Sequence, residues 1–153
     1  MTLQLTSPAF GNGDRVPKEY TADGKNQSPP LKWANVPEGT KSLALICDDQ
    51  DAPMGTWVHW VLYDITVGLN ELEQGIPPMR LVLNGAKQGM NSFHKIGYGG
   101  PSPPPGKPHR YFFKLFALDT SLNVQPDIDA KKLEVAMNGH VLGEAQLVGL
   151  YSR

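Results

Sequence analysis

Short runs of apolar residues alternate along this chain with polar stretches that are rich in Gly, Pro, Asn and Asp. The run from Ser42 to Asp49 is almost continuously apolar, which predicts a strand that is buried on both faces. Other runs are dense in the β-branched and aromatic residues that favour strands. The further predicted strands are Thr2 to Thr6 at a sheet edge, Leu31 to Trp33, Trp57 to Ile65, Arg80 to Asn84, Arg110 to Leu118 and Val141 to Tyr151.

One helix is predicted, from about Asp129 to Met137. Asp127 or Asp129 can accept hydrogen bonds from its first turn, and Gly139 is suited to ending it. The stretch from Ala9 to Pro30 is rich in turn residues and predicts a long surface loop. No repeat or linker divides the 153 residues. We therefore expect one domain, residues 1–153, that is mainly β: a Greek-key β-sandwich with one or two short helices.

Composition excludes several classes of partner. The formal net charge of −1 gives no general attraction to nucleic acid or to an anionic membrane, so an anion site would have to be local. The single cysteine, Cys47, excludes an internal disulfide and a cysteine-based zinc site, and its apolar neighbours predict a buried, inert thiol. The N-terminus lacks a signal-peptide pattern, and no apolar run approaches the roughly 18 residues of a membrane span. A cytoplasmic protein is expected.

Three polar residues stand at the ends of apolar strand faces. Because side chains alternate along a strand, the residues expected to share a face can be grouped by parity. The groups are Trp57, His59, Val61 and Tyr63; His109, Tyr111, Phe113, Leu115 and Ala117; and Leu43, Leu45, Cys47 and Asp49. If these strands are neighbours, His59, His109 and Asp49 meet where the core opens, in a pocket suited to a small anion.

The residue types fit such a ligand. A protonated histidine donates from both ring nitrogens, so two of them can hold two phosphate oxygens. Asp49 can accept from a histidine nitrogen, which fixes the tautomer, or from the ammonium group of a zwitterionic ligand. Gly99, Gly100 and Gly106 can present backbone N–H donors, and Pro103 to Pro105 stiffen the same loop. Trp57 and Tyr98 are expected to form walls of the pocket.

Simpler roles are expected for the neighbouring residues. Asp51, before Ala52-Pro53, is typical of a turn residue that bonds to the backbone. Arg110 points away from His109 and is expected to pair with a carboxylate. The remaining residues of this kind are Trp60, Phe112 and Phe116, which are expected in the core, and His94 and His140, which are expected to be surface or structural.

The same segments resemble the phosphatidylethanolamine-binding protein family, also called the Raf kinase inhibitor family, in its compact bacterial and archaeal branch. The family carries an Asp-Pro-Asp-Ala-Pro segment before a Trp/His strand and a Gly-Pro-Pro-x-Gly loop that runs into His-Arg-Tyr. The matching residues are Asp49 to Pro53 with Trp57 to Trp60, Pro103 to Gly106 with His109 to Tyr111, Ser28 to Trp33, and Gly139-His140. The resemblance spans nearly the whole chain.

This resemblance implies a Greek-key β-sandwich that binds phosphate-like anions and phosphoethanolamine. By the family pattern the ligand residues are Asp49, His59, His109 and Tyr111, with Trp57 and Pro104 at the mouth of the pocket. It implies no cofactor and no bound metal, and it makes a homodimer the expected assembly. A role in modulating a protein partner, as kinase or protease inhibitors do, is a further implication.

The chain also departs from the family pattern. Gln50 replaces the usual proline after the first aspartate, and Ser102 stands where many compact members have cysteine. The C-terminal helical extension of animal members, which covers the pocket, is not found after the final predicted strand. Kinase inhibition and lipid carriage are therefore not expected to transfer from the animal proteins.

Non-catalytic binding of a small anionic ligand is the leading hypothesis. A metal-dependent enzyme is an alternative, because two histidines and an aspartate match the non-haem iron triad in residue type. A hydrolase that uses Ser102, a histidine and Asp49 is another, although no Gly-x-Ser-x-Gly elbow surrounds Ser102. Proteinase inhibition is supported by family analogy alone.

Overall fold

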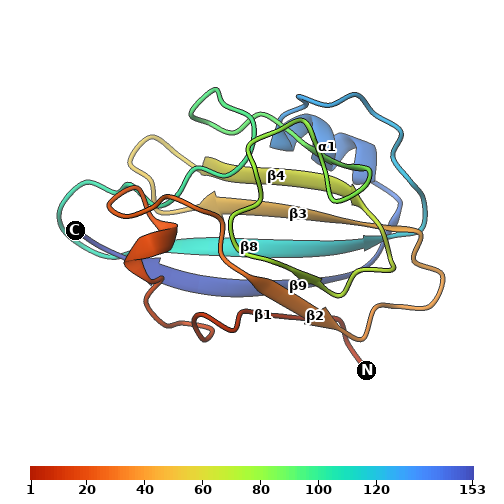
Figure 1. Ribbon diagram of the computed structural model, residues 1–153, viewed down its shortest axis with the longest axis horizontal. Helices are drawn as coiled ribbons and strands as arrows, with labels where there is room; N and C mark the ends of the chain where they lie inside the picture. The colour runs from red at the N-terminus through yellow and green to blue at the C-terminus, as the bar shows by residue number, and fades with distance from the viewer.

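A computed structural model, which describes residues 1–153, has two antiparallel β-sheets and one α-helix (Figure 1). The larger sheet has six strands in the order β6-β7-β4-β3-β8-β9, and the smaller has three in the order β1-β2-β5. The elements are β1 Gln4–Thr6, a 3-10 helix Lys18–Tyr20, β2 Leu31–Ala34, β3 Ser42–Asp49, β4 Trp57–Ile65, β5 Glu71–Leu72, β6 Leu81–Val82, β7 Ala86–Gln88, β8 His109–Leu118, α1 Ala130–Met137 and β9 Val141–Tyr151.

The larger sheet contains a Greek-key arrangement. Strand β4 pairs with β3, β7 pairs with the far side of β4, and β8 returns to pair with the free side of β3. The resulting order β8-β3-β4-β7 places the last of these strands beside the first. The predicted mainly-β Greek-key sandwich is confirmed. Strands β5 and β7 were not predicted, because two or three residues are too few to show a periodic pattern.

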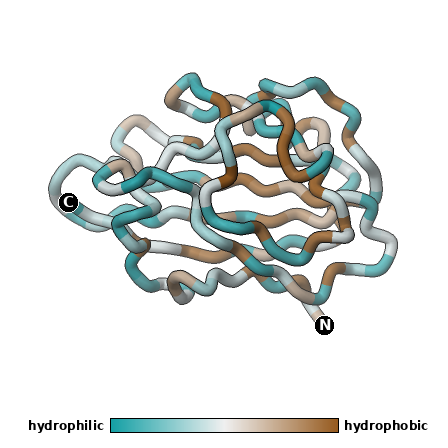
Figure 2. The backbone as a smooth tube through the Cα atoms, in the orientation of Figure 1, coloured by the Kyte–Doolittle hydropathy of each residue, from teal (hydrophilic) through white to brown (hydrophobic).

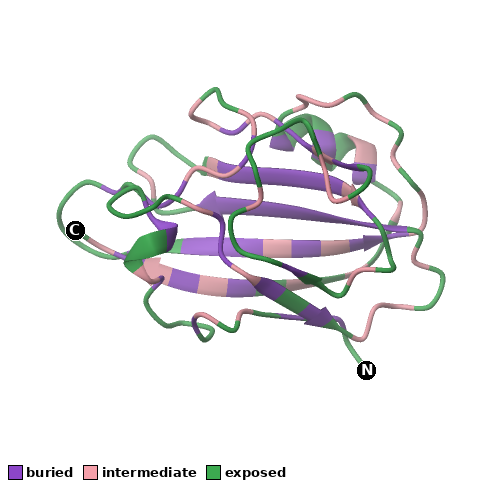
Figure 3. Cartoon of the chain, viewed as in Figure 1, coloured by how far each residue is buried: buried purple, intermediate pink, exposed green.

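The main hydrophobic core lies between the two sheets, and α1 covers the opposite face of the larger sheet (Figures 1 and 2). Strand β3 is buried along its whole length, as predicted (Figure 3). Leu45 and Cys47 face the core between the sheets, and Ala44 and Ile46 face α1. Burial raises the pKa of the Cys47 thiol well above its ordinary value, which agrees with an inert core residue.

Helix α1 begins and ends where the sequence predicts. Asp129 is its N-cap, and its carboxylate accepts a hydrogen bond from the Lys132 N–H at 2.9 Å. Leu133 and Met137 are buried against the larger sheet. Gly139 has φ +84°, a left-handed conformation that glycine adopts without strain and that turns the chain toward β9. With eight residues, α1 is too short to span a bilayer, and the structure has no other helix that could do so.

Strand β4 departs from regular pairing with β3 at two places, opposite Leu43–Leu45 and opposite Cys47–Asp48, and the second of these lies at His59. Asp48 is paired with Val58, whereas the adjacent Cys47 is paired with Trp60, so His59 has no partner on β3. This arrangement is a β-bulge, which bends a strand and changes the alternation of its side chains. The extra residue is one of the two histidines on which the predicted site depends.

The bulge makes one prediction of shared faces wrong. Trp60 lies in the core between the sheets, whereas Val61 and Tyr63 pack under α1. The His59 ring contacts the ring of Tyr111, which belongs to the core between the sheets. His59 therefore lies on the same side as Trp60, and not on the face of Val61 and Tyr63.

The stretch from Ala9 to Pro30 is more than the surface loop that was predicted. Phe10, Val16 and Tyr20 are buried in the core between the sheets. The N–H of Val16 donates to the Leu150 carbonyl at 2.8 Å, so this stretch also covers part of the outer edge of β9. The composition of this stretch is dominated by turn residues, and its three core positions are too widely spaced to form a periodic pattern.

The α1 cap provides a test of the fold. Asp129→Ala removes the acceptor for the Lys132 N–H, so we expect the free energy of unfolding in urea to fall by about 1 kcal/mol. Lys131→Ala, on the exposed side of the same helix, is the matched control. Equal stability of the two variants would contradict the assigned cap.

Candidate functional site

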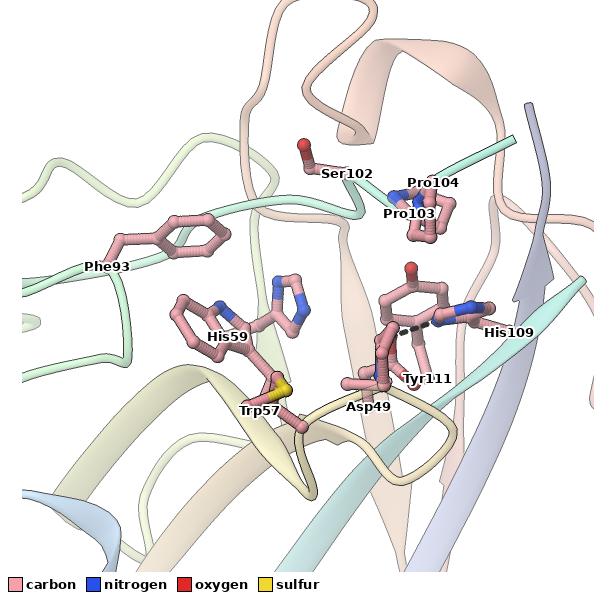
Figure 4. Close-up of a pocket in the computed structure, with 12 residues that line it drawn as sticks. Asp49, Trp57, His59, Phe93, Ser102, Pro103, Pro104, His109 and Tyr111 are labelled. Carbon is pink, nitrogen blue, oxygen red and sulfur yellow. Dashed lines mark hydrogen bonds and ion pairs between the residues drawn. The ribbon is translucent and has the colours of Figure 1, made fainter. Parts of the chain in front are cut away.

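A pocket of about 250 Å³ opens at the end of the sandwich where β3 ends and where β4 and β8 begin (Figure 4). This is the end at which the C-terminus lies in Figure 1. Six of the seven site residues predicted from the sequence line the pocket. They are Asp49, Trp57, His59, Pro104, His109 and Tyr111. The strand order explains the convergence, because β3 lies between β4 and β8 in the larger sheet.

Asp49 and His109 form a buried pair on one side of the pocket. The His109 Nδ1 lies 2.6 Å from Asp49 Oδ2, and both residues are less than one-tenth exposed. The other carboxylate oxygen accepts the N–H of Asp51 at 2.8 Å. Because a carboxylate can only accept, the hydrogen of this bond lies on Nδ1. The Nε2 atom of His109 is left as the ring nitrogen that can meet a ligand.

His59 lies on the other side of Tyr111 (Figure 4). Its Nδ1 donates to the Gly99 carbonyl at 2.5 Å, and its ring packs edge-on against the rings of Tyr111 and Phe93. The residue is 3% exposed. This burial lowers the pKa of His59 below its ordinary value of 6.5, although the hydrogen bond to Gly99 opposes the shift. The unliganded ring is therefore neutral at pH 7, with Nε2 as an acceptor.

Tyr111 places a hydroxyl group between the two imidazoles. The side chain is buried, and its hydroxyl is the one buried side-chain polar atom that lacks a hydrogen-bond partner. Figure 4 shows this hydroxyl directed toward the side of the pocket that Pro103 forms. Burial and the nearby Asp49 charge raise the pKa of Tyr111 well above its ordinary value, so the hydroxyl keeps its hydrogen and can donate.

The mouth of the pocket is apolar. Trp57 packs edge-on against Phe93 with 5.4 Å between the ring centroids, and the exposed Met54 lies at the rim. Phe93 was not predicted, because it lies in a loop without periodicity. Its place is set by Asn91, whose Oδ1 accepts the N–H of Phe93 and whose Nδ2 donates to the Gly97 carbonyl.

The loop that follows β3 is fastened to β8. Asp51 accepts the backbone N–H of Arg110 at 2.9 Å and the Arg110 guanidinium at 2.9 and 3.0 Å. The guanidinium lowers the pKa of Asp51 to about 2. The prediction that Arg110 pairs with a carboxylate is confirmed, whereas the Asp51 carboxylate bonds to the backbone of β8 and not within its own turn. This ion pair fixes the loop that carries Ala52, Pro53 and Met54 to the rim.

Two expectations about the glycine-rich loop are wrong. Tyr98 does not form a wall of this pocket, because its hydroxyl donates to the Tyr20 carbonyl at 2.6 Å and its ring packs against Trp60. The backbone donors of Gly99 and Gly100 are also unavailable to a ligand. They are bonded to the His59 carbonyl and to Asn26 Oδ1 respectively. Residue type alone cannot show that these donors hold the loop to the rest of the protein.

The geometry offers little to the two enzyme hypotheses. No group of three or more His, Cys, Asp or Glu side chains is arranged to hold a metal ion. Ser102 lines the pocket, but its hydroxyl accepts from Arg153 at 3.3 Å and has no histidine as a partner. In Figure 4 this hydroxyl points away from His59 and Tyr111. His94 is exposed and His140 pairs with Asp119 at 2.8 Å, so both have the surface or structural roles expected.

The fold and the pocket define a β-sandwich domain with a small pocket at one end. The family model described as phosphatidylethanolamine-binding protein matches residues 6–152, and this chain belongs to that family. A UPF0098 protein of Aquifex aeolicus is 50% identical over 99% of this chain and 89% of its own length. A UPF0098 protein of Methanothermobacter thermautotrophicus is 49% identical over 99% of both chains.

Solved structures agree with this assignment. A Chlamydia trachomatis protein named as a putative phosphatidylethanolamine-binding protein homologue has a TM-score of 0.91 at 38% identity, over 99% of this chain and 98% of that chain. The E. coli protein YbcL, named as a new member of the mammalian PEBP family, has a TM-score of 0.93 at 32% identity, over 100% of this chain and 99% of that chain. The resemblance seen in the sequence is confirmed.

The environment of His59 predicts its titration. Because the folded protein disfavours the charged ring, the NMR resonance of His59 should titrate below pH 6.5, and its absence in His59→Gln identifies it. The unfolded chain then binds a proton that the folded protein does not, so stability contributed by neutral His59 is lost as pH falls below 6.5. A pKa above 6.5 in the free protein would contradict the assigned burial.

Proposed function

We propose that this protein binds the phosphate, or a similar anionic group, of a small ligand between His59, Tyr111 and His109, without catalysing a reaction. The observation that carries the proposal is the buried Tyr111 hydroxyl, which has no partner within the protein. A buried polar group without a partner is costly, and an anion at this point would accept its hydrogen bond. Membership of the phosphatidylethanolamine-binding protein family supports ligand binding at such a pocket.

The protonation states set a condition on this binding. With Nδ1 of each imidazole bonded to a carbonyl or a carboxylate, Nε2 of His59 and of His109 is the atom that faces the ligand. Nε2 can donate to an anion only when the ring is doubly protonated. Since His59 is neutral in the free protein at pH 7, the anion has to be bound together with a proton. The ligand site therefore couples anion affinity to pH.

The carboxylate of Asp49 contributes to selectivity in this proposal. Its negative charge offsets part of the positive charge that the imidazoles carry when they donate to an anion. Such a site favours a ligand whose own charge is small or is balanced by an ammonium group, as in phosphoethanolamine. Homodimer formation, a protein partner and a cytoplasmic location stay predictions.

Three substitutions test the ligand set. His59→Ala, His109→Ala and Tyr111→Phe should each weaken the binding of O-phosphoethanolamine by about tenfold or more, because each removes a donor to a charged group. Isothermal titration calorimetry measures the affinities, and His94→Ala, on the exposed surface, is the control. Tyr111→Phe should not reduce thermal stability, because it removes a hydroxyl that has no partner. Equal affinity in all five proteins would reject the proposed site.

The coupling to protons gives a second test. Binding should raise the pKa of His59, so affinity should fall as pH rises through the raised value, and binding near that pH should take up protons. Sulfate is the suitable probe because its charge does not change between pH 5 and pH 8. Calorimetry in buffers of different ionisation enthalpy counts the protons. Binding without proton uptake, or with proton release, would contradict the proposed donor role of His59.

A further inference from the structure

One wall of the pocket is a proline-rich segment that can donate few backbone hydrogen bonds to the rest of the protein. It runs from Pro101 to Pro105, where four of the five residues are prolines. Proline has no N–H, so the segment offers carbonyl acceptors but hardly any backbone donor. It contains neither strand nor helix. Its place over the pocket, visible at Pro103 and Pro104 in Figure 4, therefore depends on donors from other parts of the chain.

Two residues supply those donors. The N–H of Ala22 donates to the Pro101 carbonyl at 2.9 Å. The guanidinium of Arg153 donates to the Pro103 carbonyl at 3.2 Å and to the Ser102 hydroxyl at 3.3 Å. Ser102 and Pro103 line the pocket, whereas Arg153 does not. Arg153 thus holds this wall by hydrogen bonds from outside the pocket.

Arg153 is fixed in turn by Asp23. Its Nε lies 3.1 Å from both carboxylate oxygens of Asp23, and its Nη2 lies 2.8 Å from Oδ1. The Tyr151 hydroxyl donates to Oδ2 of the same carboxylate at 2.7 Å. The planar guanidinium suits such a multiple contact, which sets its orientation as well as its distance. Asp23 lies in the stretch from Ala9 to Pro30 that the sequence suggested to be a surface loop.

We infer that Arg153 is a positioning residue of the ligand site, and that Asp23 orients it. Together they hold the wall formed by Ser102 and Pro103 at the separation from Tyr111 and the two imidazoles that an anion requires. A wall held in place before binding lowers the ordering cost of binding. This inference rests on the proposed function, because it concerns the affinity of that same pocket.

A purely electrostatic role for Arg153 makes a different prediction. If its positive charge alone attracted the anion, Asp23→Ala would leave that charge unpaired and would strengthen binding. If Arg153 acts through the wall, Asp23→Ala removes its anchor and weakens binding. The sign of the effect of Asp23→Ala therefore separates the two roles.

The experiment measures the affinity for inorganic phosphate by calorimetry in the wild type, Arg153→Ala, Asp23→Ala and the double variant. Each single variant should bind about fivefold more weakly, and the double variant no more weakly than Arg153→Ala, because both changes release the same wall. Arg153→Lys should rescue only part of the affinity, because lysine lacks the planar fork. Lys32→Ala, which breaks the exposed ion pair with Glu71, should bind as the wild type does.

Hydrogen exchange distinguishes a loosened wall from a general loss of structure. The amides of Ser102, Gly106 and Lys107 should exchange faster in both single variants, while those of β3 and β8 should not change. Wild-type affinity in Arg153→Ala, or tighter binding in Asp23→Ala, would overturn the inference. Absence of phosphate binding by the wild type would instead reject the proposed function.

Discussion

The pocket depends on the extra residue that β4 carries at His59. Cross-strand neighbours share a face of a sheet, so Cys47 and Trp60, which are paired, both point into the core between the sheets. With strict alternation His59 would point to the opposite face, toward α1. The bulge returns it to the side on which Asp49 and Tyr111 lie. One inserted position therefore decides whether the two histidines meet at all.

The pocket end of the molecule contains buried polar groups of a kind that destabilise a protein core. Tyr111 keeps a hydroxyl without a partner, and His59 is buried where its charged form is disfavoured. Departures from good local chemistry are expected at functional sites. The surrounding structure compensates with strong local bonds, such as the one from His109 to Asp49 and the pairing of Asp51 with Arg110. Hydrogen bonds thus hold the polar side chains at this end in place, and the Tyr111 hydroxyl alone is left without a partner.

Much of this architecture could be predicted because the long strands carry clear patterns. The continuous apolar run of β3 and the β-branched and aromatic residues of β4 predicted the bounds of these two strands closely. Local capping chemistry did the same for α1, where Asp129 stands immediately before the first turn. Family motifs then indicated six residues that do line the pocket.

The rest depends on tertiary contacts that residue type does not reveal. The bulge at His59 is visible only in the register with β3, and Tyr98 is turned away from the pocket by a bond to the distant Tyr20 carbonyl. Phe93 reaches the mouth because Asn91 shapes its loop, which no periodic pattern could have shown. In each case the deciding partner lies far along the chain or in an irregular segment.

Pro103 and Pro104 have no amide hydrogens, so one side of the pocket offers no backbone hydrogen-bond donor while the other carries the donors of the histidines and the tyrosine. An anion held as proposed receives hydrogen bonds only from the histidines and the tyrosine, and it meets pyrrolidine rings and carbonyl oxygens on the opposite side. A phosphate monoester suits both sides, with its terminal oxygens toward the donors and its ester oxygen and organic group toward the rings. In the proposed complex the organic group of the ligand would therefore leave the pocket on the proline side.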